Sequence, residues 1–105
     1  MPDTVDTKTR IIVAAGLIRR SSDGKILVSK RMAGTHLADS WEFPGGKVEL
    51  GEDPRETVRR ELMEELGVEV VIGDIYAVGQ HSYAEREVIL LVYEARISQG
   101  TPRCI

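Results

Sequence analysis

The chain has 105 residues, enough for one small domain, and 42% hydrophobic with 30% charged residues is a globular rather than a disordered composition. Its formal net charge of −3 gives no reason to expect direct nucleic-acid binding, which usually needs a basic face. One cysteine, Cys104, excludes an internal disulfide and fits a reducing compartment. No apolar run is long enough to cross a membrane, so we expect a cytoplasmic protein with no membrane partner.

The N-terminal part is predicted to form a hairpin. Residues 1–9 are polar and are expected to be a disordered tail, which leaves residues 10–105 as a single domain. Residues 11–18 are rich in β-formers and predict a strand. Residues 21–24 carry a turn signal, so residues 25–29 are predicted to return as the second strand.

A loop over residues 32–40 and a short extended piece at residues 41–43 come next in the chain. The extended piece ends at Pro44, followed by Gly45 and Gly46. Glycines let the backbone adopt positive φ and approach a ligand closely. A backbone carbonyl at this point could therefore join a metal shell. By itself, however, a glycine pair more often marks only a turn, and a loop is expected to follow it before the helix.

The central helix is predicted over residues 54–66 from its end signals. Asp53 suits the N-cap, Pro54 the first helical position and Gly67 the C-cap. At roughly 100° per residue, the apolar side chains Val58 and Leu62 fall on one stripe with Leu66, which predicts the buried face.

Strands are predicted again after the helix. Residues 68–72 and 75–78 are strand-like with Gly73 and Asp74 between them, residues 79–86 are polar, and residues 87–97 form another strong strand pattern. Strands on both sides of one helix predict an α/β domain with a mixed sheet.

Three glutamates crowd the C-terminal half of the helix. Glu61 lies one turn from both Glu64 and Glu65, and like charges at these spacings destabilise a helix by roughly 0.2–0.5 kcal/mol each. The helix dipole disfavours anions there as well. One interpretation is a solvated acidic face that Arg59 and Arg60 compensate. The other is a site for a hard divalent cation such as Mg²⁺, which takes oxygen ligands.

The segment from Gly46 to Val68 resembles the Nudix box, G-x5-E-x7-R-E-U-x-E-E-x-G-U, in which U is aliphatic. Every fixed position is matched, by Gly46, Glu52, Arg60, Glu61, Leu62, Glu64, Glu65, Gly67 and Val68. Residues 31–46 are similar to the MutT branch and to pyrimidine nucleoside triphosphate pyrophosphohydrolases. The resemblance implies a Nudix α/β/α sandwich with a mixed sheet, in which the box forms a loop–helix–loop.

The resemblance also implies an activity. Such enzymes hydrolyse a nucleoside triphosphate to the monophosphate and pyrophosphate with Mg²⁺, for which Mn²⁺ can substitute; substrates of the 8-oxo-dGTP or the CTP/dCTP type are expected. The alternatives are a non-catalytic nucleotide- or metal-binding module, or a hydrolase of ADP-ribose or a nucleotide sugar. By position, Glu61, Glu64 and Glu65 would bind the metal with the Gly45 carbonyl, and Arg60 would orient the glutamates. Glu61 is a candidate for the general base as well as for a ligand.

Further residues are assigned to the nucleotide by the same resemblance. Arg31 matches a phosphate-contacting arginine, and the other matched positions are His36, Glu42, Phe43, Pro44, Gly45, Tyr83 and Arg86. Tyr83 would stack near the base. Each also has a plainer interpretation, such as a solvated charge for Arg31, a loop histidine for His36 or a core side chain for Phe43.

The end of the chain carries one more expectation. Relatives continue beyond the position of Ile105 with a final strand and a C-terminal helix, so the domain is expected to be C-terminally truncated. A sheet face left uncovered would expose apolar surface and favour a homodimer.

Overall fold

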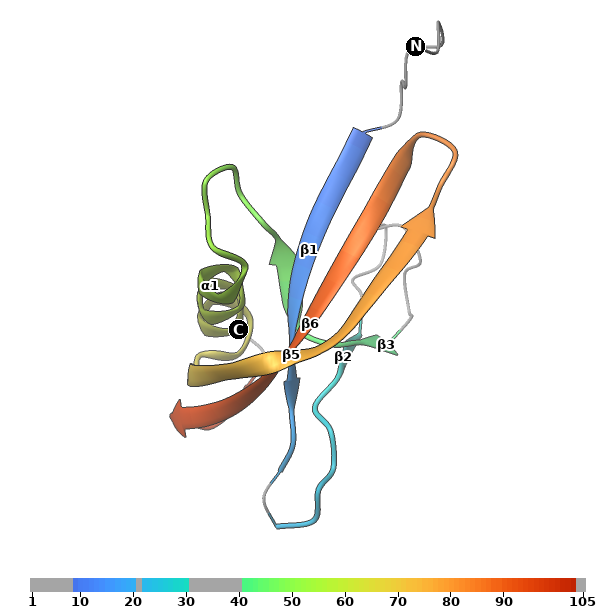
Figure 1. Ribbon diagram of the computed structural model, residues 1–105. Coiled ribbons are helices and arrows are strands. Elements are labelled where there is room, and N and C mark those ends of the chain that lie inside the picture. The colour runs from blue at the N-terminus through green and yellow to red at the C-terminus, as the bar shows by residue number, and fades with distance from the viewer. Residues whose placement is uncertain (1–8, 21, 31–40, 104–105) are drawn as a thin grey trace, which may run out of the picture.

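A computed structural model describes residues 9–20, 22–30 and 41–103. A mixed sheet with one helix packed against it forms the main body, and a two-stranded sheet lies on the side away from the helix (Figure 1). The elements are β1 (Thr9–Ile18), β2 (Ser29–Lys30), β3 (Trp41–Glu42), β4 (Gly45–Lys47), α1 (Pro54–Leu66), β5 (Glu69–Ser82) and β6 (Arg86–Gln99). The expected loop over residues 32–40 and residues 1–8 of the expected tail lie outside the described residues, whereas Thr9 already belongs to β1.

The main sheet has the strand order β4-β1-β6-β5. β1 runs parallel to β6, with Thr9 opposite Arg86 and Ile18 opposite Ala95. β4 pairs antiparallel with β1, and β5 pairs antiparallel with β6. The prediction of an α/β domain with a mixed sheet is therefore confirmed.

The helix begins and ends where its capping residues place it. The Asp53 side chain accepts a hydrogen bond from the Arg55 amide at 2.8 Å, and Pro54 opens the first turn. Gly67 ends the helix at φ 70°, and its amide donates to the Met63 carbonyl at 3.0 Å. The predicted bounds of α1 are confirmed.

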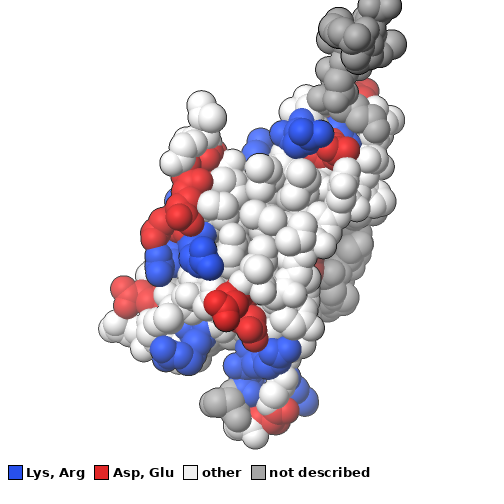
Figure 2. All heavy atoms as spheres, viewed as in Figure 1, with Lys and Arg blue, Asp and Glu red and all other residues white. Residues whose placement is uncertain are grey.

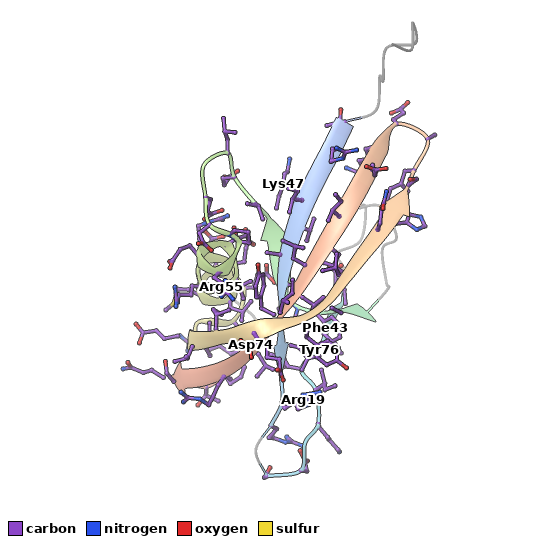
Figure 3. All side chains as sticks on the ribbon, in the orientation of Figure 1. Arg19, Phe43, Lys47, Arg55, Asp74 and Tyr76 are labelled. Carbon is purple, nitrogen blue, oxygen red and sulfur yellow. The ribbon has the colours of Figure 1, made fainter. Side chains whose placement is uncertain are left out.

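The core lies between α1 and the sheet. The predicted stripe of α1 is buried, and it packs with strand residues into one cluster: Ala14, Ile18, Val58, Leu62, Leu66, Val68, Val70 and Tyr93. A Cβ added to Gly16 would lie 3.1 Å from Val58 and 3.2 Å from Leu62, so the helix approaches β1 closely at this glycine. The guanidinium of Arg55, which is labelled in Figure 3, lies 5.0 Å from the centre of the Tyr93 ring.

Three strand predictions are corrected by pairing between distant segments. Residues 68–72 and 75–78 are not separate strands, because β5 runs continuously to Ser82 and accommodates Gly73 and Asp74 in a bulged stretch. Residues 25–28 return beside the end of β1, with the antiparallel bridge between Arg19 and Ile26 and a hydrogen bond from the Leu27 amide to the Ile18 carbonyl at 2.9 Å, but they are not a regular strand; Ser29 begins β2, which pairs with β3. Residues 45–47, expected to lie in a turn and loop, form β4.

Within the described residues, α1 covers part of one sheet face, so this part of the chain supplies the sheet and one helical layer of the predicted sandwich. Beyond the helix, Ile12 and Val78 remain 40% and 63% exposed. Figure 2 shows a broad uncharged surface over the sheet, with acidic and basic side chains gathered along α1 and at the ends of the strands. No helix among the described segments is both long and apolar enough to span a membrane.

Candidate metal and nucleotide site

Two of the box glutamates lie between α1 and β4. Glu61 and Glu65 are one helical turn apart on α1, and both are partly buried. The Gly45 backbone bonds to the Glu65 carboxylate. The Glu61 carboxylate lies against Gly46, where an added Cβ would come within 2.6 Å of both carboxylate oxygens. The two glycines thus allow a strand to run directly beside two carboxylates.

The Glu65 carboxyl has a strongly perturbed pKa. Burial raises it most, followed by the hydrogen bond and the negative charge of Glu61 and by the charge of Glu42, while the Gly45 backbone lowers it; the result is about 8. The Glu65 carboxyl is therefore mostly protonated at neutral pH and is hydrogen-bonded to Glu61. A divalent cation would relieve the same repulsion with hard oxygen ligands, so these two residues fit the metal that the box implies.

Arg60 connects Glu52, in the loop before α1, to the glutamates of the helix. Its Nε and Nη2 atoms donate to the two oxygens of Glu52 at 2.9 and 3.0 Å, and Nη1 donates to Glu61 at 2.8 Å. Nη1 also lies 3.6 Å from a carboxylate oxygen of Glu64. The hydrogen bond and charge of Glu52, together with Glu61, raise the pKa of Arg60 despite partial desolvation, so it stays charged.

Glu52 braces the loop that precedes the helix. Its Oε1 accepts from the Glu49 amide at 3.1 Å and from the Thr57 hydroxyl at 2.7 Å. The Arg60 guanidinium, followed by these two donors, lowers the pKa of Glu52 to about 2. Glu52 is therefore a fixed anion with both oxygens occupied.

The third glutamate lies apart from the other two. Glu64 is 58% exposed at its side chain and is directed toward Arg60. Across the described ranges, no three carboxylate, imidazole or thiol groups are arranged closely enough to hold a metal ion. The structure thus brings together Glu61 and Glu65, and leaves Glu64 on the surface beside them.

A cavity of about 540 Å³ lies on the other side of β4 from Glu61. Its walls come from β1, β3, β4, β6 and the segment before β2: Val13, Ala15, Val28, Glu42, Phe43, Gly45, Gly46, Lys47 and Leu90. Glu42, Phe43 and Gly45, all assigned to the nucleotide from the sequence, are in this set, and Figure 3 labels Phe43 and Lys47. Glu42 joins the two parts of the site, because it lines the cavity and its charge acts on Glu65.

The other residues assigned to the nucleotide are placed differently. Pro44 is fully buried, and its carbonyl accepts a hydrogen bond from the Gly16 amide at 2.9 Å. Tyr83 and Arg86 lie at the β5–β6 turn, where the Tyr83 ring contacts His81 at 4.4 Å between ring centres and Arg86 at 5.7 Å. Neither lines the cavity.

Arg31 and His36 lie outside the described residues. A larger groove of about 610 Å³ adjoins the other side of α1, where Glu52 and Arg60 line it. That groove contains none of the residues assigned to the nucleotide, whereas Glu42, Phe43 and Gly45 line the cavity beside β4, so this cavity is the better candidate for the substrate.

Sequence reasoning missed three features of the site. Lys47 and Leu90 line the cavity, and Thr57 holds Glu52. Lys47 lies inside the box at a position the motif leaves free. Thr57 lies outside the predicted apolar stripe, although it is fully buried. Only contacts between segments distant in the sequence reveal these roles.

Comparisons with known proteins agree on one family. The NUDIX domain matches residues 10–103 of this chain. An 8-oxo-dGTP diphosphatase from Haemophilus influenzae is 40% identical over 95 residues, which cover 90% of this chain and 69% of that protein. A CTP pyrophosphohydrolase from Escherichia coli is 42% identical over 91 residues, which cover 87% of this chain and 66% of that protein.

Solved structures show the same similarity. A MutT protein from Methanosarcina mazei superposes with a TM-score of 0.85 at 31% identity, covering 96% of this chain and 73% of that one. A MutT NUDIX hydrolase from Burkholderia pseudomallei gives 0.83 at 32% identity, with coverages of 92% and 74%. The match spans nearly the whole chain and includes the box with its glutamate pair. The chain therefore belongs to the NUDIX family.

Proposed function

We propose that this chain hydrolyses nucleoside triphosphates to the monophosphate and pyrophosphate, as a MutT-like NUDIX hydrolase that depends on a divalent cation. The observation that carries the proposal is the pair Glu61 and Glu65, which lies across β4 from a cavity of about 540 Å³. A cavity of this volume is in the range that accommodates small ligands. The names of the relatives support the same reaction class.

Each residue of the site has a role in this proposal. Glu61 and Glu65, joined by Glu64, would hold Mg²⁺, and Mn²⁺ would substitute for it; the Gly45 carbonyl would add a ligand. The bound ion would neutralise phosphate charge and activate a water for attack on phosphorus. Arg60 fixes the position of Glu61 by a charge-assisted hydrogen bond.

The remaining cavity residues would hold the nucleotide. Lys47 supplies a positive charge for the phosphates, and Phe43 with Leu90 gives an apolar surface for the base. Glu42 would act on both the nucleotide cavity and the glutamate pair, because it lines the cavity and its charge acts on Glu65. Arg31 and His36 remain predictions for further contacts.

Two substrates are favoured for a specific reason. The relatives at 40% and 42% identity are named for 8-oxo-dGTP and for CTP, respectively, and their similarity to this chain is nearly equal. We propose that the natural substrate is of the 8-oxo-dGTP or the CTP/dCTP type. The first would place the protein in nucleotide sanitation, which protects DNA from oxidised precursors.

A nucleotide panel tests the proposal. The purified protein is incubated with dGTP, 8-oxo-dGTP, CTP, dCTP and ADP-ribose at millimolar Mg²⁺, and products are separated by chromatography. We expect one triphosphate to give monophosphate and pyrophosphate, with loss of turnover in chelator and in Glu61→Gln. Turnover of ADP-ribose alone would move the protein to another NUDIX branch. No turnover by folded protein that still binds nucleotide would make it a non-catalytic module.

Three further expectations accompany this proposal. A cytoplasmic location follows from the single cysteine, and cell fractionation would test it. The absence of direct nucleic-acid binding follows from the net charge of −3. A homodimer through exposed apolar sheet surface stays a prediction that sedimentation equilibrium would test.

A further inference from the structure

Thr57 is an unusual residue in the core beneath the site. It lies in the second turn of α1 and is fully buried. Among the described residues, Thr57 is the one polar residue in the buried core. Its neighbour Val58 is buried equally and is apolar, so burial at this place does not itself require a hydroxyl. A buried hydroxyl is costly unless it is hydrogen-bonded.

The Thr57 hydroxyl is bonded to a carboxylate. Its Oγ1 lies 2.7 Å from Oε1 of Glu52 and 3.4 Å from the carbonyl oxygen of Asp53. A hydroxyl has one proton to donate, and the shorter contact to the charged acceptor is the stronger hydrogen bond. The proton of Thr57 is therefore directed to Glu52.

Glu52 connects the Thr57 hydroxyl, through Arg60, to the glutamates proposed to bind the metal. Both of its oxygens accept from Arg60, at 2.9 and 3.0 Å, and Arg60 donates in turn to Glu61 at 2.8 Å. The order is Thr57, Glu52, Arg60 and Glu61. Each link is a hydrogen bond to a charged group, and only the first member is anchored in the apolar core.

The loop that carries Glu52 has little other anchorage. Leu50, two residues before it, is fully exposed, and Gly51 adopts a positive φ of 80°. The Glu49 amide also bonds to Glu52, but Glu49 itself is an exposed residue of the same loop. Thr57 and Arg60 both hold the Glu52 carboxylate from α1, and of these two only Thr57 is fully buried.

We propose that Thr57 is a positioning residue, whose hydroxyl sets the Glu52–Arg60 pair and thereby places Glu61 for the divalent cation. The inference rests on the proposed function, since it assigns a role toward the metal of that site. Thr57 does not touch the substrate or the ion. Residues that hold the metal ligands in place typically change metal affinity by 10- to 100-fold. Thr57 is further from the ion than such residues, so we expect its loss to change metal affinity by about tenfold.

The test compares Thr57→Ser with Thr57→Ala. Both variants lack the γ-methyl group, and they differ only in the hydroxyl, so Thr57→Ser is the matched control. Alanine has the highest helix propensity, which favours folding of the second variant. Mn²⁺ affinity is measured by electron paramagnetic resonance without nucleotide, and urea unfolding is recorded in parallel.

We expect Thr57→Ala to weaken Mn²⁺ binding by about tenfold and Thr57→Ser by less than about twofold. In a Glu52→Gln background the difference between the two variants should fall below about twofold, because the hydroxyl acts through Glu52. Turnover should follow the same order, with the loss in kcat larger than the change in KM. If Thr57 had only a structural role, Mn²⁺ binding by each variant would instead weaken in proportion to its loss of stability.

Two outcomes would overturn the inference: equal Mn²⁺ affinities of Thr57→Ser and Thr57→Ala, or a difference that persists undiminished in Glu52→Gln. Failure of the proposed function gives a different result. In that case the wild-type protein does not turn over any nucleotide, while the Mn²⁺ titrations still decide the role of Thr57. If Thr57→Ala unfolds, Thr57→Val, which keeps the γ-methyl group and replaces the hydroxyl with a second methyl group, is compared with the wild type instead.

Discussion

The Glu61 carboxylate occupies the space that the first atom of a side chain at Gly46 would need. A Cβ there would come within 2.6 Å of both carboxylate oxygens, closer than real Cβ atoms approach other atoms. The first glycine of the box is thus needed for contact rather than for an unusual turn, because β4 is a regular strand at this point. Glycine at this position lets the Glu61 carboxylate lie against the backbone of β4.

Gly46→Ala is expected to keep the fold and to lose activity. The Glu61 carboxylate is the end of a side chain and can move aside, but a displacement of about 1 Å can reduce turnover by roughly 100-fold. Steady-state kinetics and circular dichroism measure the two effects. Gly79→Ala is the control, since its Cβ would meet open space. Full activity of Gly46→Ala would show that this position of Glu61 is not the productive one.

Gly45→Ala is expected to act on stability instead. Its Cβ would lie 2.5 Å from the Ala15 Cα, and backbone cannot move aside as a side chain can. Overpacking of this kind costs about 2–3 kcal/mol in the free energy of unfolding. Urea denaturation measures it. A midpoint equal to that of the wild type would mean that β4 is not held against β1 as the structure has it.

The stability of the metal-free protein should fall as the pH rises. The folded-state pKa of Glu65 is raised to about 8 from the ordinary value of 4.5, so its contribution is fully present below pH 4.5 and is lost toward pH 8. Glu65→Gln removes this dependence. From pH 5 to 8 the wild type should lose about 1–2 kcal/mol more than the variant, allowing for solvent screening. Parallel pH profiles of the wild type and the variant would refute the raised pKa of Glu65.

Metal binding should release a proton at neutral pH. At pH 7 the Glu65 carboxyl, with its pKa of about 8, is mostly protonated, and an ion must displace that proton. Calorimetry of Mg²⁺ or Mn²⁺ binding in buffers of different ionisation enthalpy should show release of about one proton. Glu65→Gln should release none. Metal affinity of the wild type should rise between pH 6 and 8, and a pH-independent affinity would contradict the assignment.

Phe43→Ala should weaken nucleotide binding more than it slows the chemical step. Phe43, labelled in Figure 3, lines the cavity on the side of the sheet away from α1. The glutamate pair lies on the helix side of β4. Loss of base stacking costs about 1–3 kcal/mol, which corresponds to an increase in KM of roughly tenfold with little change in kcat. Tyr76→Ala, an exposed aromatic outside the cavity, is the control. An unchanged KM for Phe43→Ala would place the base elsewhere.

The helix and its glutamates could be predicted because their signals are local. Asp53, Pro54 and Gly67 mark the ends of α1 within 15 residues of one another, and the spacing of Val58 and Leu62 marks its buried face. The motif then assigned the glutamates without any knowledge of their surroundings.

Features that depend on pairing between distant segments could not be predicted. Gly45 and Gly46 are a turn signal by themselves and become strand β4 only because β1 pairs with them. The residues at positions 79–82 remain in β5 because their backbone N–H and C=O groups are paired with β6. The Glu52 carboxylate, eight residues before Arg60, holds the guanidinium that lies beside Glu61 and Glu64. No local pattern encodes these relationships.

The parallel pairing of β1 with β6 has a consequence for the synthesis of the protein. Arg10 and Glu87, which form an ion pair across these strands, are 77 residues apart in sequence. During translation β1 leaves the ribosome long before its partner exists, so its apolar residues stay unpaired while most of the domain is being made. Domains dominated by such distant contacts fold slowly, in milliseconds to seconds, and their unpaired strands are prone to aggregate meanwhile. β6, which is synthesised after the other three strands of the described main sheet, completes the sheet on which the site depends.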